Sequence, residues 1–225
     1  MEKEITLVIV STHEMSEKKE FLENVSSSVN FSTKIMYIVN KGGLGLTKIY
    51  KEALSKAETS IVVFMHDDIE FLRNGWGEEI YRLFQEHQDY GIIGVAGSAE
   101  FDSNAAWWNY KKIYGQVLHR KDGRSWLTSF SPLLKKDLEE VCVIDGLFMA
   151  VQKERISQVF DDNIDGFDFY YFDFCLSNFI DGKTKIGVTT NIRIAHNSIG
   201  ELSENWFHNK EKINNKFGKK YPLSV

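Results

Sequence analysis

Cysteine and proline are scarce in this chain, which has only two of each among its 225 residues. Cys142 and Cys175 lack the CxxC spacing of zinc and redox motifs, so the sequence indicates neither kind of site. We expect both as reduced, buried thiols of a cytoplasmic protein. Because prolines are so few, regular secondary structure can extend over most of the chain.

Long hydrophobic runs are also missing. No apolar segment approaches the roughly 18 residues of a membrane-spanning helix, so we expect no membrane span. Charged residues follow Met1 directly, which argues against a signal peptide. Positive charge is not in excess, because 27 Lys and Arg stand against 32 Asp and Glu, a net charge of −5. Nucleic acid is therefore not the expected partner, and an anionic ligand would need a metal ion or a few placed cations.

What the sequence does contain is a regular alternation of expected strands and helices in its first 97 residues. Continuous apolar runs predict strands buried on both faces, and apolar residues at helical spacing predict amphipathic helices. The expected strands cover 5–10, 35–39, 60–65 and 91–97, and the expected helices cover 14–29, 46–57 and 76–86. This order is typical of βαβ units around a mainly parallel sheet, whose ligands bind at the carboxyl ends of the strands.

The second half is less regular and shows no boundary to a second domain. Residues 98–140 are expected to form loops with short antiparallel strands, and a strand over 141–151 is interrupted by Asp145-Gly146. The remaining expected elements are helices over 153–160, 170–180 and 202–221 and strands over 185–189 and 192–195.

Polar side chains stand at the ends of the first three expected strands, where Thr12, Asn40 and the run His66-Asp67-Asp68 follow apolar residues. Acidic side chains at such a strand end can hold a divalent cation, which in turn can hold phosphates. The alternative interpretation is a solvated acidic turn. His196 ends a later strand, and a lone histidine is usually structural. It becomes a metal-ligand candidate if the sheet brings it near Asp68, because imidazole and carboxylate are a normal metal pair.

Further candidates lie in the second half. Asp168 and Asp173 precede or begin an expected helix and are candidates for a general base, although an aspartate there can equally cap the helix. Asp145 stands among apolar residues, where a charge is costly to bury without a partner, and Gly146 suggests either a β-bulge or close approach of a ligand. Trp108 belongs either to the core or to a surface on which a sugar stacks.

Taken in order, these segments resemble the family 2-like glycosyltransferases of the GT-A fold, and most of all a bacterial glycosyltransferase-like subgroup. The resemblance extends from about residue 5 to about residue 201. The segments that carry it are 5–12, 39–40 with 45–51, 64–69, 94–98 followed by Trp107-Trp108, 143–151, 166–176 and 192–196. It implies a single GT-A domain over 1–201, with a Rossmann-like, mainly parallel sheet flanked by helices. Residues 202–225 would form a polar helix that packs on or extends this domain.

The resemblance implies transfer of a sugar from a nucleotide-diphosphate sugar, with UDP as the default, to a hydroxyl of a glycan, lipid-linked or protein acceptor. Inversion by direct displacement is expected. Asp68 matches the metal ligand of the family's DxD motif, His66 replaces the first aspartate, and His196 matches a late histidine. The expected cofactor is Mn²⁺ or Mg²⁺.

The remaining roles are also implied by the resemblance. Residues expected to contact the nucleotide are Thr12, Asn40 and Asp67, and those expected to contact sugar or acceptor are Asp145, Gly146 and Trp108. Tyr171 stands where the family has its catalytic base, so the base would be Asp173, which we favour, or Asp168. The alternative is a catalytically inactive relative that binds a nucleotide, a glycan or a partner protein. A sugar nucleotidyltransferase and a two-metal phosphoesterase are less favoured.

Overall fold

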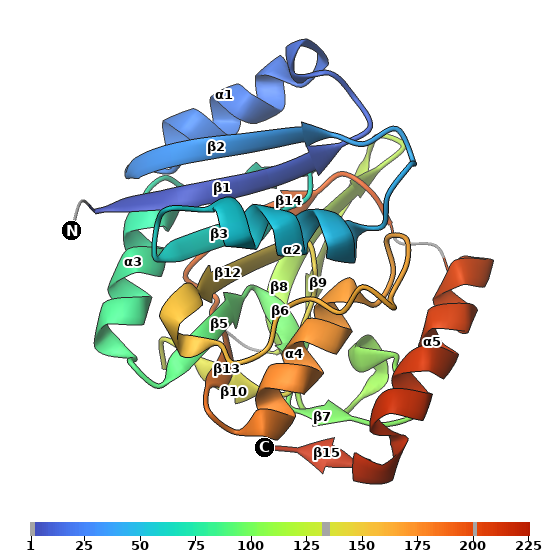
Figure 1. The fold of residues 1–225 in the computed structure, drawn as a ribbon. Helices are drawn as coiled ribbons and strands as arrows, with labels where there is room; N and C mark the ends of the chain where they lie inside the picture. The colour runs from blue at the N-terminus through green and yellow to red at the C-terminus, as the bar shows by residue number, and fades with distance from the viewer. Residues whose placement is uncertain (1–2, 132–135, 200–201) are drawn as a thin grey trace.

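A seven-stranded sheet forms the centre of the computed structural model, which describes residues 3–131, 136–199 and 202–225 (Figure 1). The strand order is β10-β13-β5-β12-β3-β1-β2. These strands are β1 (Glu4–Ser11), β2 (Ser32–Val39), β3 (Ile61–Met65), β5 (Tyr90–Gly94), β10 (Glu139–Val141), β12 (Phe148–Gln152) and β13 (Lys185–Val188). β12 lies antiparallel between β3 and β5, and β10 is antiparallel to β13, while the other neighbours run parallel. Five of the seven strands therefore run in the same direction, and the expected mainly parallel α/β sheet is confirmed.

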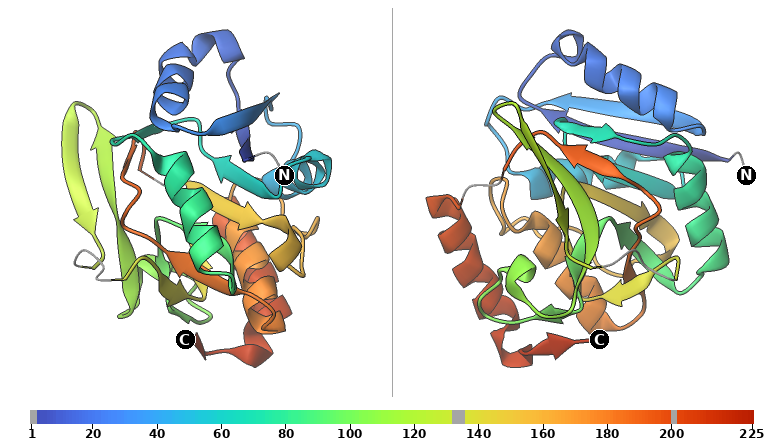
Figure 2. Two further views of the ribbon diagram at one scale, coloured as in Figure 1. Left: turned by 90° about the vertical axis from the view of Figure 1, so that its left-hand side faces the viewer. Right: turned by 180° about the vertical axis from the view of Figure 1, so that it is seen from behind.

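Helices cover both faces of this sheet. They are α1 (Lys19–Ser28), α2 (Leu46–Lys56), α3 (Trp76–Glu86), α4 (Tyr170–Asp181) and α5 (Glu204–Phe217). α2 and α4 lie on one face, and α3 lies on the other together with a second sheet (Figures 1 and 2). α1 begins later than expected, because residues 15–17 form a separate 3₁₀ turn. Within the described part of the chain, no helix is long and apolar enough to cross a membrane.

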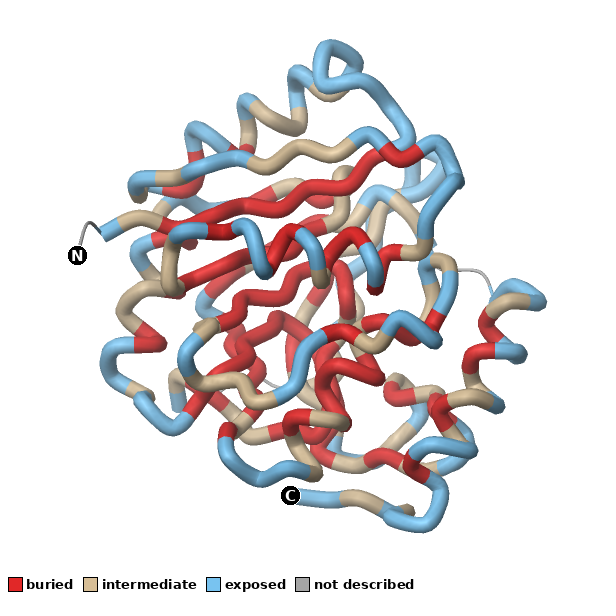
Figure 3. Tube along the Cα trace, viewed as in Figure 1, coloured by how far each residue is buried: buried red, intermediate tan, exposed pale blue. Residues whose placement is uncertain are grey.

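The buried strands are those with a neighbour on each side. β1 and β3 are buried along almost their whole length, as their continuous apolar runs predict (Figure 3). The expectation that residues 35–39 form a buried strand is wrong, because β2 is half-buried or exposed throughout. Its apolar residues lie at the edge of the sheet, where β2 pairs only with β1.

The second sheet has the order β11-β6-β8-β14-β4, with β9 paired to β8. Its strands are β4 (Ile69–Phe71), β6 (Ala96–Ser98), β8 (Ile113–Lys121), β9 (Arg124–Ser129), β11 (Val143–Ile144) and β14 (Ile194–His196). The expected loops and short antiparallel strands over 98–140 are present as β6 to β10 and their connections, apart from 132–135, which lie outside the described residues. The single strand expected over 141–151 is instead divided between the two sheets, with Asp145-Gly146 at the division.

The prediction of a helix over 153–160 is wrong beyond the first turn, which is the 3₁₀ turn Lys153–Arg155. The backbone amides of Ser157 and Gln158 donate to the side-chain oxygen of Asn178 in α4, at 3.0 and 3.1 Å, rather than to helical carbonyls. A side-chain acceptor from another element therefore replaces the helix ladder here.

The C-terminal segment packs on the same core as the rest of the chain. α5 buries Trp206, Ile213 and Phe217, and β15 (Leu223–Ser224) pairs with β7 (Glu100–Phe101). Residue 201, at which we expected the main domain to give way to this helix, lies outside the described residues. Cys142 and Cys175 are buried free thiols, as expected.

Candidate functional site

The carboxyl ends of three parallel strands meet at one edge of the central sheet. β1 pairs with β2 up to Ser11 opposite Val39, and with β3 up to Ile9 opposite Met65. The polar residues that follow the three strands therefore emerge at one edge, as the alternation of strands and helices predicts.

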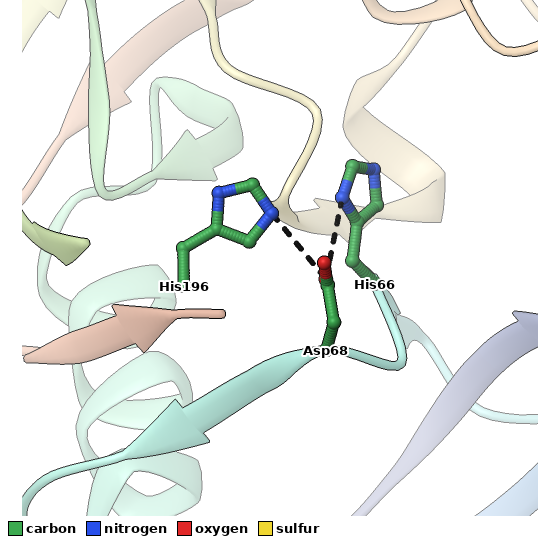
Figure 4. Close-up of side chains that lie close together, drawn as sticks. All are labelled: His66, Asp68 and His196. Atoms are coloured by element: carbon green, nitrogen blue, oxygen red, sulfur yellow. Dashed lines mark ion pairs between the residues drawn. The ribbon is translucent and has the colours of Figure 1, made fainter. Parts of the chain in front are cut away.

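His66, Asp68 and His196 form a cluster at this edge, and their side chains point toward one another (Figure 4). Oδ1 of Asp68 lies 3.3 Å from Nε2 of His196 and 4.0 Å from Nδ1 of His66. The three ligand atoms lie within 4.8 Å of one another. The structure therefore meets the condition under which His196 becomes a metal-ligand candidate.

Two elements of the second sheet bring His196 to Asp68. β14 pairs antiparallel with β4, so that His196 lies opposite Ile69, the residue after Asp68. The amide of Asn197 then donates to the backbone oxygen of Asp68 at 2.9 Å. His66 comes from the end of β3, so the cluster joins the two sheets.

Burial and mutual attraction set the charges in the cluster. Burial alone raises the pKa of Asp68, but the attraction of His196 and His66 outweighs it and holds this pKa well below its usual range. Burial lowers the pKa of His66, which favours the neutral ring. For His196 the attraction of Asp68 outweighs burial and raises the pKa. An ionised carboxylate thus lies between two imidazoles.

These residues fit a divalent cation. Oδ1 of Asp68 is buried, and no described group gives it a well-directed hydrogen bond. One carboxylate oxygen and two imidazole nitrogens suit Mn²⁺ better than Mg²⁺, which prefers oxygen ligands. The cluster can therefore supply three ligands, and phosphate oxygens or water would complete the coordination.

Asp67 joins the turn to β1 and to the segment before α1. It accepts a hydrogen bond from the hydroxyl of Ser11 and pairs with Nζ of Lys18 at 2.9 Å. A cleft of about 670 Å³ lies here, between residues 16–24 and the turn 67–70. Both Asp67 and Asp68 line this cleft, so the cleft and the three-residue cluster share Asp68.

Thr12 and Asn40 emerge at the same edge in different environments. Thr12 is exposed, whereas Asn40 is buried. The side-chain nitrogen of Asn40 donates to the backbone carbonyl of Leu44 at 2.8 Å, and its side-chain oxygen accepts from the backbone amides of Gly43 and Leu44. Asn40 therefore shapes the loop that enters α2.

Asp145 and Gly146 lie in the turn between β11 and β12, beside the cluster. A side-chain oxygen of Asp145 accepts from the amide of Leu147 at 2.9 Å. Its negative charge acts to raise the pKa values of both His66 and His196, although burial opposes this effect. Gly146 has no room for a side chain, because a Cβ would lie 2.3 Å from the hydroxyl oxygen of Tyr170.

The two candidate bases occupy unlike environments. The side chain of Asp173 is fully buried, and Nζ of Lys216 lies 2.6 Å from its Oδ1. An acceptor hydroxyl cannot reach this carboxylate in the structure. Asp168 is half-buried, accepts a hydrogen bond from Ser203 at 2.9 Å and acts on the phenol of Tyr171, as Asp145 does. Of the two carboxylates, Asp168 is therefore the one that is not fully buried.

Trp108 is half-buried and lies edge-on to the buried Trp107, with ring centroids 6.2 Å apart. Both tryptophans belong to the 3₁₀ turn Trp107–Asn109, and Trp107 packs on Phe130. These contacts place Trp108 against the core.

Three residues near the cluster were not predicted from the sequence. His196 of β14 lies beside His119 of β8, and His119 lies beside Trp126 of β9. The rings of His119 and Trp126 stack with their centroids 5.6 Å apart. Tyr170 contacts His66 directly, with 3.0 Å between its hydroxyl and Nε2. Only the pairing of distant segments brings these residues here, and no local motif indicates it.

Comparisons with known proteins agree with this arrangement. The sequence profile of the glycosyltransferase-like family matches residues 6–221. Among curated proteins no match is found. The structure of GalNAc-T7 with UDP, GalNAc and Mn²⁺ is similar with a TM-score of 0.64 at 12% identity, over 95% of this chain and 48% of that one.

Two further solved structures share the fold at low identity. The mannosyltransferase PcManGT from Pyrobaculum calidifontis, in complex with GDP-Man and Mn²⁺, gives a TM-score of 0.55 at 9% identity, over 98% of this chain and 64% of that one. S. aureus TarS gives 0.58 at 10% identity, over 96% and 39%. The chain therefore spans less than two thirds of the length of each structure. The likeness confirms the expected GT-A fold.

Proposed function

The chain belongs to the glycosyltransferase-like family, and we propose that its strand-end site transfers a sugar from a nucleotide-diphosphate sugar to an acceptor hydroxyl with the help of a divalent cation. The observation that carries this proposal is the convergence of His66, Asp68 and His196, whose ligand atoms lie within 4.8 Å of one another. When bound there, a divalent cation would neutralise the charge of the diphosphate leaving group.

The donor nucleotide would lie along the ends of β1, β2 and β3. The cleft beside Asp67 and Asp68 has the size of a small-molecule site and shares Asp68 with the cluster. Thr12 is exposed and available for contact with the base or ribose, while Asn40 would act by shaping its loop. UDP is our default because GalNAc-T7 was crystallised with UDP, although PcManGT was crystallised with GDP-Man.

Sugar and acceptor would lie on the side of Asp145, Gly146 and Trp108. Of the two carboxylates considered as base, Asp168 is the one whose surroundings suit the role, because Asp173 is buried against Lys216. The carboxylate would take the proton of the acceptor hydroxyl as its oxygen bonds to the anomeric carbon. The bond from that carbon to the diphosphate would break on the opposite face, which inverts the configuration.

A catalytically silent relative is the second candidate. Tyr171 stands where the resemblance places the base, and Asp173 is sequestered, so the site lacks an obvious carboxylate at that position. Such a protein would bind a nucleotide or glycan, or a partner protein, without turnover.

Release of nucleoside diphosphate from a panel of UDP-, GDP- and dTDP-sugars, with Mn²⁺, tests the proposal. We expect the wild type to turn over one of these donors. Asp68→Ala should lower that rate by at least about 100-fold, because a metal ligand is lost. Asp162→Asn, a change at an exposed carboxylate paired with Lys51, should leave the rate unchanged. Wild-type turnover by a folded Asp68→Ala protein would contradict the metal assignment.

A further inference from the structure

The hydroxyl of Tyr170 lies between the turn that follows β11 and the cluster formed by His66, Asp68 and His196. It is 3.0 Å from Nε2 of His66 and 2.9 Å from the backbone oxygen of Gly146. Tyr170 begins α4, a helix that is remote in sequence from both partners. One phenol therefore touches a candidate metal ligand and the turn that holds Asp145.

The donors and acceptors of these groups allow only one arrangement of hydrogens. A carbonyl oxygen can only accept, so the single proton of the Tyr170 hydroxyl must be donated to Gly146. The phenol oxygen then has only lone pairs to offer to His66. Nε2 of His66 must therefore carry the ring proton, and in the neutral imidazole Nδ1 is left with a free lone pair.

That lone pair lies on the side of the ring where a cation would bind. Nδ1, and not Nε2, is the nitrogen of His66 that faces Asp68 (Figure 4). We propose that Tyr170 is a positioning residue that locks His66 in the Nε2–H tautomer and so presents Nδ1 as a metal ligand together with Asp68 and His196. This inference rests on the proposed function in taking the cluster to be a metal site.

Tight packing holds the Tyr170 hydroxyl in place. The side chain is almost fully buried, and its ring meets that of Tyr50 edge-on at a centroid distance of 5.3 Å.

Gly146 is part of the same hydrogen-bonded arrangement. A Cβ at this position would lie 2.3 Å from the Tyr170 hydroxyl oxygen and 2.6 Å from Cδ1 of Tyr171. Any larger residue must therefore push the phenol away from the carbonyl and from His66. The absence of a side chain at Gly146 allows the phenol to reach both partners.

Nitrogen-15 NMR of the metal-free protein reads the tautomer directly, with the His66 signals assigned by their loss in His66→Gln. We expect a protonated Nε2 and an unprotonated Nδ1 in the wild type. In Tyr170→Phe the lock is removed and both tautomers should appear. A wild-type ring protonated at Nδ1 would overturn the proposal without any further variant.

Calorimetric titration with Mn²⁺ alone measures the consequence for binding. Loss of a partner that orients a metal ligand typically costs about 10- to 100-fold in metal affinity, and we expect a loss of that size in Tyr170→Phe. Tyr50→Phe is the matched control, because it removes a neighbouring buried hydroxyl that does not contact His66, and its affinity should stay within about twofold of wild type. Gly146→Ala should behave like Tyr170→Phe.

A double-mutant comparison separates positioning from general damage. In a His66→Ala background, Tyr170→Phe should cause little further loss of Mn²⁺ affinity, since the residue that it orients is absent. An equal loss in both backgrounds, or unchanged affinity in Tyr170→Phe, would overturn the proposal. If the wild type binds no Mn²⁺, the metal part of the proposed function fails, and the nitrogen shifts still decide whether Tyr170 locks His66.

Discussion

At the scale of single residues, the same side-chain type serves different purposes according to its surroundings. Asp68 lies between two imidazoles, Asp67 ties its turn to Ser11 and Lys18, and Asp173 is buried against Lys216. The family resemblance favoured Asp173 as the base, because it matches an aspartate of the family's acidic motif. The packing of α5 on α4, which brings Lys216 to it, has no local signature in the sequence.

The dependence of the free energy of unfolding on pH should reflect the burial of Asp173. Burial raises the pKa of this carboxyl although Lys216 opposes the shift, so its protonated form favours the folded state. The stabilisation is fully present below the unfolded pKa of about 3.9 and is lost as the pH rises through the higher folded value. We therefore expect the free energy of unfolding of Asp173→Asn to increase relative to that of wild type as the pH rises from about 4 to 7.

Urea unfolding of both proteins across that range measures the difference. Asp162→Asn serves as a control at an exposed site and should keep a constant offset from wild type. A difference between Asp173→Asn and wild type that stays flat, or falls with pH, would show that burial does not govern Asp173.

At the scale of elements, periodicity predicted most strands and helices of the first 97 residues, because apolar spacing there reports burial directly. It failed where partners are remote. β2 contains a continuous apolar run and yet lies at the sheet edge. After β12 no helix forms, because the backbone amide of Ser157 donates to the side-chain oxygen of Asn178 rather than to a helical carbonyl. The division of 141–151 between two sheets depends on pairings that no local pattern specifies.

The end of α4 provides a test at this scale. Gly182 follows the helix with φ of +71°, and its amide bonds back to Asn178 and Phe179 at 3.3 and 3.1 Å. A Cβ would meet nothing within 4 Å, so the cost of Gly182→Ala is conformational. We expect a loss of about 1 kcal/mol in the free energy of unfolding, and a smaller loss for Gly182→Asn.

Gly43→Ala is the matched control for this prediction. Gly43 is also free of neighbours within 4 Å, but no positive φ distinguishes it, so alanine there should be neutral or slightly stabilising. Equal effects at the two glycines, measured by chemical denaturation, would show that the left-handed turn after α4 carries no cost.

At the scale of the whole molecule, the candidate metal site joins the two sheets. His66 follows β3 of the central sheet, and His196 ends β14 of the second. The order of motifs along the chain predicted Asp68 and His196 as partners through the family resemblance. Tyr170, which contacts His66, and His119, which lies beside His196, come from α4 and β8, and only the folded chain shows that they lie near the cluster.

A ligand that bridges the sheets should stabilise the fold as a unit. At 100 times its dissociation constant, Mn²⁺ adds about 2.7 kcal/mol if it binds only the folded state, which raises the melting temperature of a chain of this size by roughly 5–10 °C. Addition of EDTA should reverse the shift.

His196→Ala should abolish this stabilisation, whereas His208→Ala, at an exposed histidine of α5, should retain it. Scanning calorimetry of the three proteins with and without Mn²⁺ provides the comparison. A shift that persists in His196→Ala would mean that Mn²⁺ binds elsewhere.

The most direct test of the account is calorimetric titration of the wild type with UDP, GDP, dTDP and CDP, each with Mn²⁺ and again with EDTA. The account predicts that one of these nucleotides binds, and that its binding requires the metal ion, because Asp68, His66 and His196 hold the cation that holds the diphosphate. Absence of binding by all four, or binding that is equally tight in EDTA, would contradict a metal-dependent nucleotide-sugar site at these strand ends.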